Sequence, residues 1–190
     1  MKNLVFLMIL TLSFNLFARD KNCKYAENKI DAFSKKRIVK TMPETLFVEK
    51  QIYIGATVLN TNLKNTRLTA SAVYVNGKHL ILFLLDNSDN ADQTGDYSSL
   101  EILLNTDEVI QFFKPTSEGT DNKDGITHWK YYLINDRQWT TFKTTPISKI
   151  RINYEDNTKG DFEIRKKNVN AISNIINCID DLNLPISPAK

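Results

Sequence analysis

The sequence has few of the residues on which catalytic and metal sites depend. It contains two histidines, two cysteines and six glycines in 190 residues. Zinc ligation by cysteine needs more ligands than these, and the chain has no Gly-x-Ser-x-Gly elbow, His-Glu-x-x-His motif or glycine-rich phosphate loop. His79 and His128 each fall in a run typical of a strand. The sequence therefore favours a non-enzymatic protein, with a hydrolase that uses paired carboxylates as the remaining enzymatic alternative.

A strong excess of charge of one sign is also missing. The formal net charge is +3, and the basic residues are scattered among acidic ones. The longest basic clusters, 35–37 and 165–167, have three residues each, and no basic stripe with interleaved aromatic residues accompanies them. Nucleic-acid binding is therefore not expected.

A long apolar run occurs at the N-terminus, where Lys2 precedes the stretch from Leu4 to Ala18 and a polar segment follows. One positive charge, a short apolar run and a small residue are typical of a secretory signal peptide. The run is too short for a membrane-spanning helix that stays in place. We expect cleavage after Ala18, so that residues 1–18 are a signal peptide and residues 19–190 form one domain without a membrane span.

The two cysteines stand far apart, Cys23 near the expected new N-terminus and Cys178 in the last predicted helix. In an exported protein an isolated pair is most simply a disulfide, although two buried free thiols are the alternative. In the chain-entropy model so long a loop contributes about 4–5 kcal/mol. We expect a periplasmic or secreted protein. None of the 20 asparagines starts an Asn-x-Ser/Thr glycosylation site, which favours a bacterial source.

Strand patterns fill most of the chain before residue 135. Asn76-Gly77 lies between two β-rich runs, Arg67–Val75 and Lys78–Leu85, and predicts a hairpin with a type I′ turn. The second run is apolar at successive positions, which predicts a central strand covered on both faces; a helix is the competing interpretation. A further hairpin is predicted around residues 105–107, and long polar loops are predicted at 86–98 and 115–125.

The C-terminal part predicts the helices. A short helix begins at Asn135 or Asp136 and runs through Phe142, and an amphipathic helix runs from about Lys166 to Leu182. The second helix has an apolar stripe formed by Val169, Ile172, Ile175, Ile176 and Ile179. Since the rest of the chain is mostly strand, the predicted fold is α+β. It is a curved, mainly antiparallel sheet of seven to nine strands with the C-terminal helix packed on one face.

Acidic residues concentrate in three predicted loops. Loops 86–98, 115–126 and 155–161 contain ten acidic and two basic residues, and consecutive hairpins would bring them to one end of the sheet. Carboxylate oxygens suit calcium. The candidate ligands are Asp86, Asp89, Asp92, Asp121 and Asp124. Their spacing does not match the helix-flanked calcium loop, so solvated turns are the other interpretation. No cofactor besides calcium is expected.

Aromatic residues also suggest a ligand pocket. Trp129, Tyr131 and Trp139 fall close together in the sequence, and with Tyr132 and Phe142 they would line an apolar pocket between the sheet and a helix. Packing in the core is the ordinary role of such residues.

Segments at both ends of the chain carry a resemblance. They are Cys23 with Lys29–Arg37, then Pro146–Arg151, and the closing Asn177–Ile179. In these segments the chain resembles uncharacterised exported bacterial proteins of this size. The resemblance implies export and a sheet-plus-helix plan, and it carries over no functional residue. We therefore expect a binding or interaction module of the cell envelope, with a protein, a glycan or a small molecule as its partner. A weak calcium-binding surface protein is the alternative.

Overall fold

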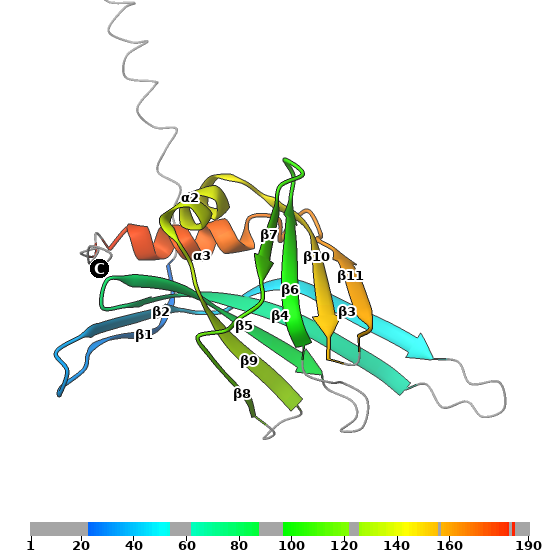
Figure 1. Cartoon of the computed structure of the whole chain (residues 1–190), viewed down its shortest axis with the longest axis horizontal. Helices are drawn as coiled ribbons and strands as arrows, with labels where there is room; N and C mark the ends of the chain where they lie inside the picture. Colours follow the sequence, from blue (N-terminus) through cyan, green and yellow to red (C-terminus); the bar gives the residue numbers. More distant parts are fainter. Residues whose placement is uncertain are drawn as a thin grey trace, which may run out of the picture.

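The computed structural model describes residues 23–53, 62–87, 97–121, 126–155, 157–182 and 184. Within these ranges eleven strands form two antiparallel sheets, and two helices accompany them (Figure 1). The α+β class and the helix packed on one side of a sheet are confirmed, although eleven strands in two sheets are present where one sheet of seven to nine strands is expected. Residues 1–18, where a signal peptide is predicted, lie outside the described residues.

The larger sheet has seven strands in the order β1-β2-β4-β5-β9-β8, with β3 also paired to β4. Its members are β1 (Tyr25–Ile30), β2 (Arg37–Thr41), β3 (Glu44–Tyr53), β4 (Asn62–Val75), β5 (Lys78–Asn87), β8 (Ser117–Asp121) and β9 (Ile126–Leu133). The smaller sheet has the order β11-β10-β6-β7. Its members are β6 (Tyr97–Leu104), β7 (Val109–Phe112), β10 (Ile147–Tyr154) and β11 (Lys159–Glu163).

The turn between β4 and β5 forms as its residues predict. Asn76 has φ 49° and Gly77 has φ 81°, the two positive values that a type I′ turn requires. The resulting pairing runs without interruption from Val75 opposite Lys78 to Thr66 opposite Asn87. This register determines which side chains of the central strands share a face.

The short helix α2 (Asp136–Thr144) begins at a capping box. The Asn135 side chain accepts a hydrogen bond from Gln138 N at 2.8 Å, and the Gln138 side chain accepts one from Asn135 N. The terminal helix α3 (Ala171–Asp180) is shorter than the apolar pattern predicts. Residues 166–170 form turns instead, in which Asn168 donates a side-chain hydrogen bond to the Leu46 carbonyl at 3.0 Å. This contact with β3 accompanies the late start of the helix.

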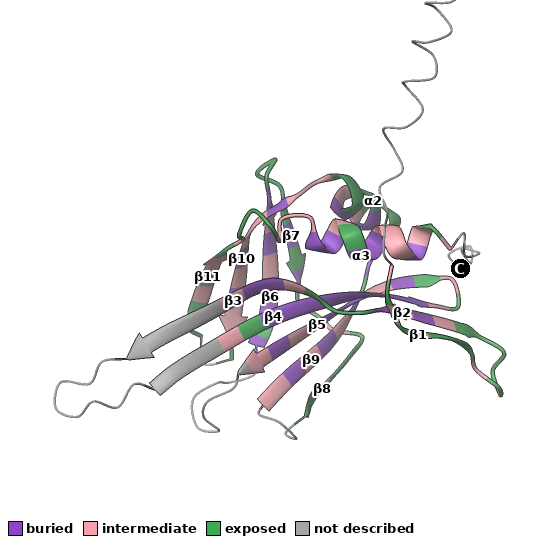
Figure 2. Cartoon of the chain, turned by 180° about the vertical axis from the view of Figure 1, so that it is seen from behind, coloured by how far each residue is buried: buried purple, intermediate pink, exposed green. Residues whose placement is uncertain are grey.

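One face of the larger sheet, the inner face, meets the rest of the fold. The helices and the smaller sheet lie on that side (Figure 1), and buried residues line α3 and the middle of β4 (Figure 2). Ile172, Ile175, Ile176 and Ile179 of α3 share one cluster with Ala70, Ala72, Ile81, Phe83 and Tyr132 of the sheet. The apolar stripe of the helix therefore packs on this face, as predicted.

The predicted disulfide is present. Cys23 and Cys178 are bonded with their Cα atoms 5.5 Å apart. Beside the bond, the Tyr25 hydroxyl donates to the Cys178 carbonyl at 2.9 Å. The start of β1 is therefore attached to the terminal helix both covalently and by a hydrogen bond.

The predicted polar loop at 115–125 is wrong over Ser117–Asp121, which form strand β8 at the edge of the larger sheet. Its residues are mostly exposed, so no apolar alternation marks it in the sequence. Backbone pairing with β9 forms this strand, from Ser117 opposite Tyr131 to Asp121 opposite Thr127. None of the helices that the structure describes is long and apolar enough to cross a membrane.

Candidate functional site

The second face of the larger sheet, the outer face, is the strongest candidate for a binding surface. Successive residues of a strand point to opposite faces, so the register defines its rows. The central row is Ser71, Leu82, Tyr131 and Ser117. The rows beside it are Thr69, Leu84, Trp129 and Gly119 on one side, and Lys40, Val73, Leu80 and Leu133 on the other. Apolar side chains thus occupy the centre of the outer face on β5 and β9, whereas β4 contributes Val73 beside the buried polar residues Ser71 and Thr69.

The centre of the outer face is buried although it does not belong to the core. Leu82 is 1% exposed and Val73 is 4% exposed, yet neither is in the core cluster on the inner face. Among the described elements, the helices and the smaller sheet lie on the opposite side (Figure 1). Within the described part of the chain, side chains of the same face are the ones placed to cover these two residues, as they are where a sheet curls toward that face.

The interaction between Glu27 and Tyr131 indicates the same curvature. Glu27 is in β1 and Tyr131 is in β9, with β2, β4 and β5 between them. Burial raises the pKa of the Tyr131 phenol, and the negative charge of Glu27 raises it further. An acid at one edge of the outer face therefore lies within electrostatic reach of an aromatic residue beyond three intervening strands.

Trp129 and Tyr131 form an aromatic pair on the outer face. Their ring centroids are 5.8 Å apart with an angle of 73° between the planes, and both side chains are half-buried. Gly119 faces Trp129 on the edge strand, and a Cβ atom there would lie 2.7 Å from Cε2 of the indole. The indole therefore leans over the backbone of β8, where the missing side chain leaves room for it.

Polar groups border this aromatic pair. One row contains Arg67, Asp86, Thr127 and Asp121 on neighbouring strands. The Thr127 hydroxyl donates to Asp86 Oδ1 at 2.7 Å. At the other edge, Glu27 stands opposite Lys40 in the pairing of β1 with β2. The outer face thus offers hydrogen-bonding groups of both charges around an apolar centre.

The structure brings two of the five predicted calcium ligands into one row. Asp86 and Asp121 flank Thr127 on β5 and β8, while Asp89, Asp92 and Asp124 lie outside the described residues. Within the described ranges no group of three or more His, Cys, Asp or Glu side chains is arranged to hold a metal ion. Calcium binding at this end stays a prediction.

Trp139, the third predicted pocket residue, lies on the opposite side of the sheet from Trp129 and Tyr131. Its ring stacks on His79 with centroids 4.1 Å apart, and its Nε1 donates to Asp180 Oδ1 at 2.9 Å. Lys143 of α2 binds the other oxygen of Asp180 at 2.5 Å. Burial lowers the pKa of His79, and the carboxylates of Asp180 and Asp136 offset part of this effect. These contacts join α2 and α3 to the inner face.

A buried lysine lies on the inner face of β9. Lys130 is 4% exposed, its ammonium lies 2.5 Å from Glu118 Oε2, and it stands 4.8 Å from the centroid of the Tyr97 ring. Other carboxylates also face bases: Asp161 binds Arg151 through both oxygens, and Arg151 lowers the pKa of this acid. These acids are engaged in ion pairs, so their geometry gives the carboxylate hydrolase no support.

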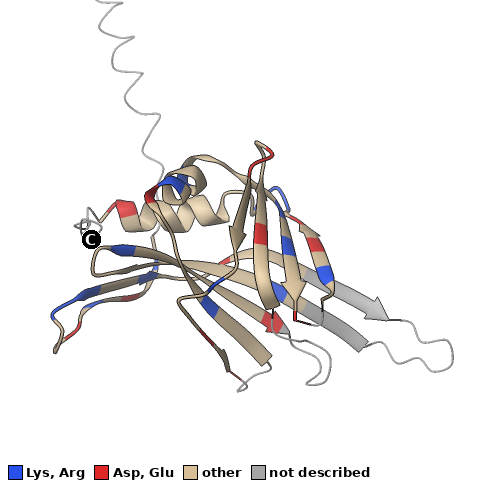
Figure 3. Cartoon of the chain, in the orientation of Figure 1, with Lys and Arg blue, Asp and Glu red and all other residues tan. Residues whose placement is uncertain are grey.

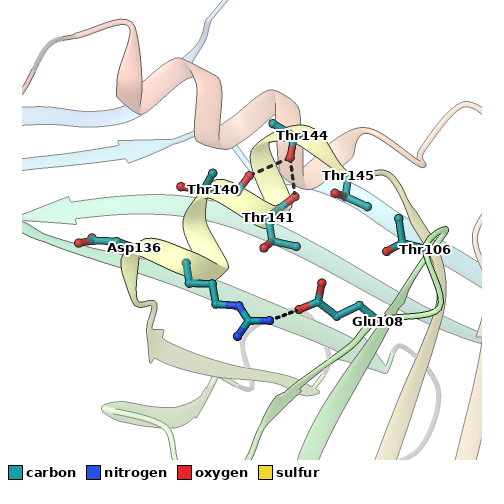
Figure 4. A pocket seen from close by; sticks show the side chains of 8 residues that line it. Thr106, Glu108, Asp136, Thr140, Thr141, Thr144 and Thr145 are labelled. Atoms are coloured by element: carbon teal, nitrogen blue, oxygen red, sulfur yellow. Dashed lines mark hydrogen bonds and ion pairs between the residues drawn. The ribbon is translucent and has the colours of Figure 1, made fainter.

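An open depression of about 590 Å³ lies between α2 and the turn after β6 (Figure 4). Arg137 Nη2 lies 3.5 Å from Glu108 Oε1, and Figure 4 marks this ion pair with a dashed line at Glu108. The lining is otherwise rich in threonine: Thr106, Thr140, Thr141, Thr144 and Thr145. The depression contains no aromatic residue and no base beside a nucleophile, so it is the weaker candidate.

Sequence reasoning did not find Gly119 as the neighbour of Trp129, or Glu27 as a charge that acts on Tyr131. Successive residues of β9 point to opposite faces of the sheet, so Trp129 and Tyr131 lie on one face and Tyr132 on the other. Each face therefore receives at least one aromatic residue. Nothing in the pattern says which of the two faces meets the core. The curl that brings Glu27 toward Tyr131 depends on pairing among five strands, which a single sequence does not specify.

Comparisons with known proteins return no relative: no protein-family model, curated protein or solved structure matches this chain.

Proposed function

We propose that the protein is an exported, non-enzymatic binding module that holds an uncharged glycan on its outer face. The observation that carries this proposal is the half-buried Trp129–Tyr131 pair on the same face as the buried residues Leu82 and Val73. Ligand sites are mostly apolar and aromatic, with a few polar groups that orient the ligand. The apolar face of a sugar ring suits the aromatic rings, and its hydroxyls suit the polar groups beside them.

The charges near the pair favour an uncharged ligand. Glu27 and Lys40 lie at one edge of the outer face, and Arg67, Asp86 and Asp121 lie in the row at the other end, so three acids and two bases are present. A charged ligand would therefore meet a group of the same charge at either end of the outer face. Sugar hydroxyls donate and accept hydrogen bonds, and therefore suit carboxylate, ammonium and threonine groups together.

Export is supported by the apolar leader and by the disulfide between Cys23 and Cys178, since such bonds persist in oxidising compartments. A periplasmic or secreted binding protein would meet the glycans of the cell envelope.

A retention assay tests the proposal. Residues 19–190, which include every described residue, would be incubated with insoluble chitin and with cellulose, two uncharged glycans. We expect retention that falls about tenfold or more in Trp129→Ala, because removing a central aromatic contact commonly costs that much affinity. Trp139→Phe is the matched control and should bind as the unaltered chain does. Equal retention of both variants, or no retention at all, would contradict the proposal.

A further inference from the structure

The hairpin of β1 and β2 presents an apolar tip to solvent. Phe33, in the turn, is 97% exposed, and Ile30 at the end of β1 is 66% exposed. Figure 2 shows exposed residues along the tip, which projects away from the two helices. Exposed Phe and Ile side chains close together are unusual in a monomeric soluble protein and commonly mark an interaction site.

The turn holds Phe33 in a defined position. Asp31 Oδ1 accepts hydrogen bonds from Ser34 N at 2.6 Å, Ser34 Oγ at 2.7 Å and Phe33 N at 3.2 Å. Asp31 N donates to the Lys36 carbonyl at 2.8 Å, and Lys35 N donates to the Asp31 carbonyl at 2.9 Å. The one carboxylate at the tip is thus used to build the turn, and the aromatic ring is directed outward.

Basic residues surround the apolar tip. Residues 23–41 contain six basic and two acidic side chains, a net charge of +4, whereas the whole chain has +3. The remaining residues together are therefore close to neutral. Lys29 is paired with Glu27 at 2.6 Å, but Lys35 and Lys36 have no carboxylate partner within the described residues. Figure 3 shows basic positions on both strands of this hairpin.

The base of the hairpin is firmly attached to the fold. The Cys23–Cys178 disulfide and the hydrogen bond from Tyr25 to the Cys178 carbonyl tie β1 to α3. The start of the hairpin is therefore fixed to the terminal helix.

We propose that the 30–37 tip docks the protein on the surface of an anionic phospholipid bilayer. Phe33 and Ile30 enter the interfacial region of the bilayer, and Lys35 and Lys36 lie beside them at the lipid headgroups. An aromatic ring suits the boundary between lipid headgroups and acyl chains, and cations beside it are attracted to anionic headgroups. Charged residues are depleted at the centre of protein–protein interfaces, so lysines directly beside the apolar side chains favour an anionic bilayer over a protein partner. This docking is independent of glycan binding, because the outer-face aromatic pair is on β9.

Vesicle co-sedimentation tests the proposal with residues 19–190, since the apolar run of residues 1–18 would itself enter lipid. We expect binding to vesicles of phosphatidylglycerol and phosphatidylcholine that weakens with added salt, and little binding to phosphatidylcholine alone. Phe33→Ser should weaken binding about tenfold. Lys35→Gln with Lys36→Gln should weaken it roughly thirtyfold, at about 1 kcal/mol for each lysine.

Two matched controls locate the surface. Phe113→Ser removes an aromatic residue that is 56% exposed elsewhere, and Lys166→Gln with Lys167→Gln removes two exposed lysines from the other basic cluster. Both controls should bind as the unaltered chain does. Failure to bind anionic vesicles, or equal losses in the control and tip variants, would overturn the proposal. Binding to an anionic polymer such as heparin that equals binding to the vesicles would also overturn it.

Discussion

The indole of Trp129 lies over Gly119 of the neighbouring edge strand, so close that a Cβ atom at position 119 would stand 2.7 Å from Cε2 of the ring. The pair is opposed in the register of β8 and β9. The position of the indole on the outer face therefore depends on the absence of a side chain across from it.

Gly119→Ala should displace the Trp129 ring and weaken glycan binding severalfold, without unfolding the protein. The matched control is Gly160→Ala on edge strand β11, where an added Cβ would lie 2.7 Å from the ring of Phe162. That variant disturbs an aromatic residue far from the outer face and should retain binding. The amount of each variant that is retained on chitin compares the two. Equal retention would show that Trp129 does not belong to the binding site.

The disulfide should be a major contribution to stability. It closes a loop of 155 residues between Cys23 and Cys178, for which the chain-entropy model gives about 5 kcal/mol. We expect Cys23→Ala with Cys178→Ala to lower Tm by about 10–15 °C. Calorimetry of this variant, and of the unaltered chain with a reductant, measures the effect. An unchanged Tm in both would show that the bond does not constrain the unfolded chain as the model requires.

Ser71→Ala should stabilise the protein. Ser71 is fully buried, and its hydroxyl has no hydrogen-bond partner within the described part of the chain. Removing a buried hydroxyl without a partner should raise the free energy of unfolding by about 1 kcal/mol. Ser148→Ala is the control, because Ser148 Oγ lies 3.1 Å from the Leu103 carbonyl and this variant should lose stability. Urea unfolding that gives the two variants the same change would contradict this expectation.

Protonation of His79 should destabilise the fold. Burial lowers the pKa of His79 from its usual value of 6.5, so the folded state binds fewer protons than the unfolded chain below that pH. Stability should therefore be complete above pH 6.5 and fall as the pH is lowered through the window beneath it. His79→Gln should flatten this part of a plot of unfolding free energy against pH. Asp161→Asn should alter the plot only in the acidic range, since Arg151 lowers the pKa of Asp161 from 3.8. An unchanged slope in His79→Gln would exclude this histidine as the cause.

The local features of the fold were predictable where the chemistry is local. Asn76-Gly77 adopts the positive φ values of its turn, and Asn135 caps α2 as its residue type indicates. The apolar stripe of α3 also faces the sheet, because apolar residues that recur with the helical period of 3.6 mark the side of a helix that is buried.

The candidate site was less predictable because it depends on pairing between distant strands. Strand β8 has a glycine, a threonine and two acids in five residues, so only its backbone bonds to β9 identify it as a strand. A lysine is expected at the surface from its residue type, yet Lys130 is buried and contacts Glu118 and the Tyr97 ring. The division of the strands into two sheets, and with it the face on which Trp129 lies, follows from contacts that single-sequence periodicity does not contain.

The most direct test of the proposed function is a fluorescence titration of Trp139→Phe, because the chain has two tryptophans and this variant leaves Trp129 as the sole reporter. The titrants would be chitotetraose and cellotetraose, two uncharged oligosaccharides. The account predicts a saturable change in Trp129 emission with at least one of them, and no such change in buried Trp139 when Trp129→Phe is titrated. Emission from Trp129 that does not respond to either titrant, while the folded protein is intact by circular dichroism, would contradict glycan binding on the outer face.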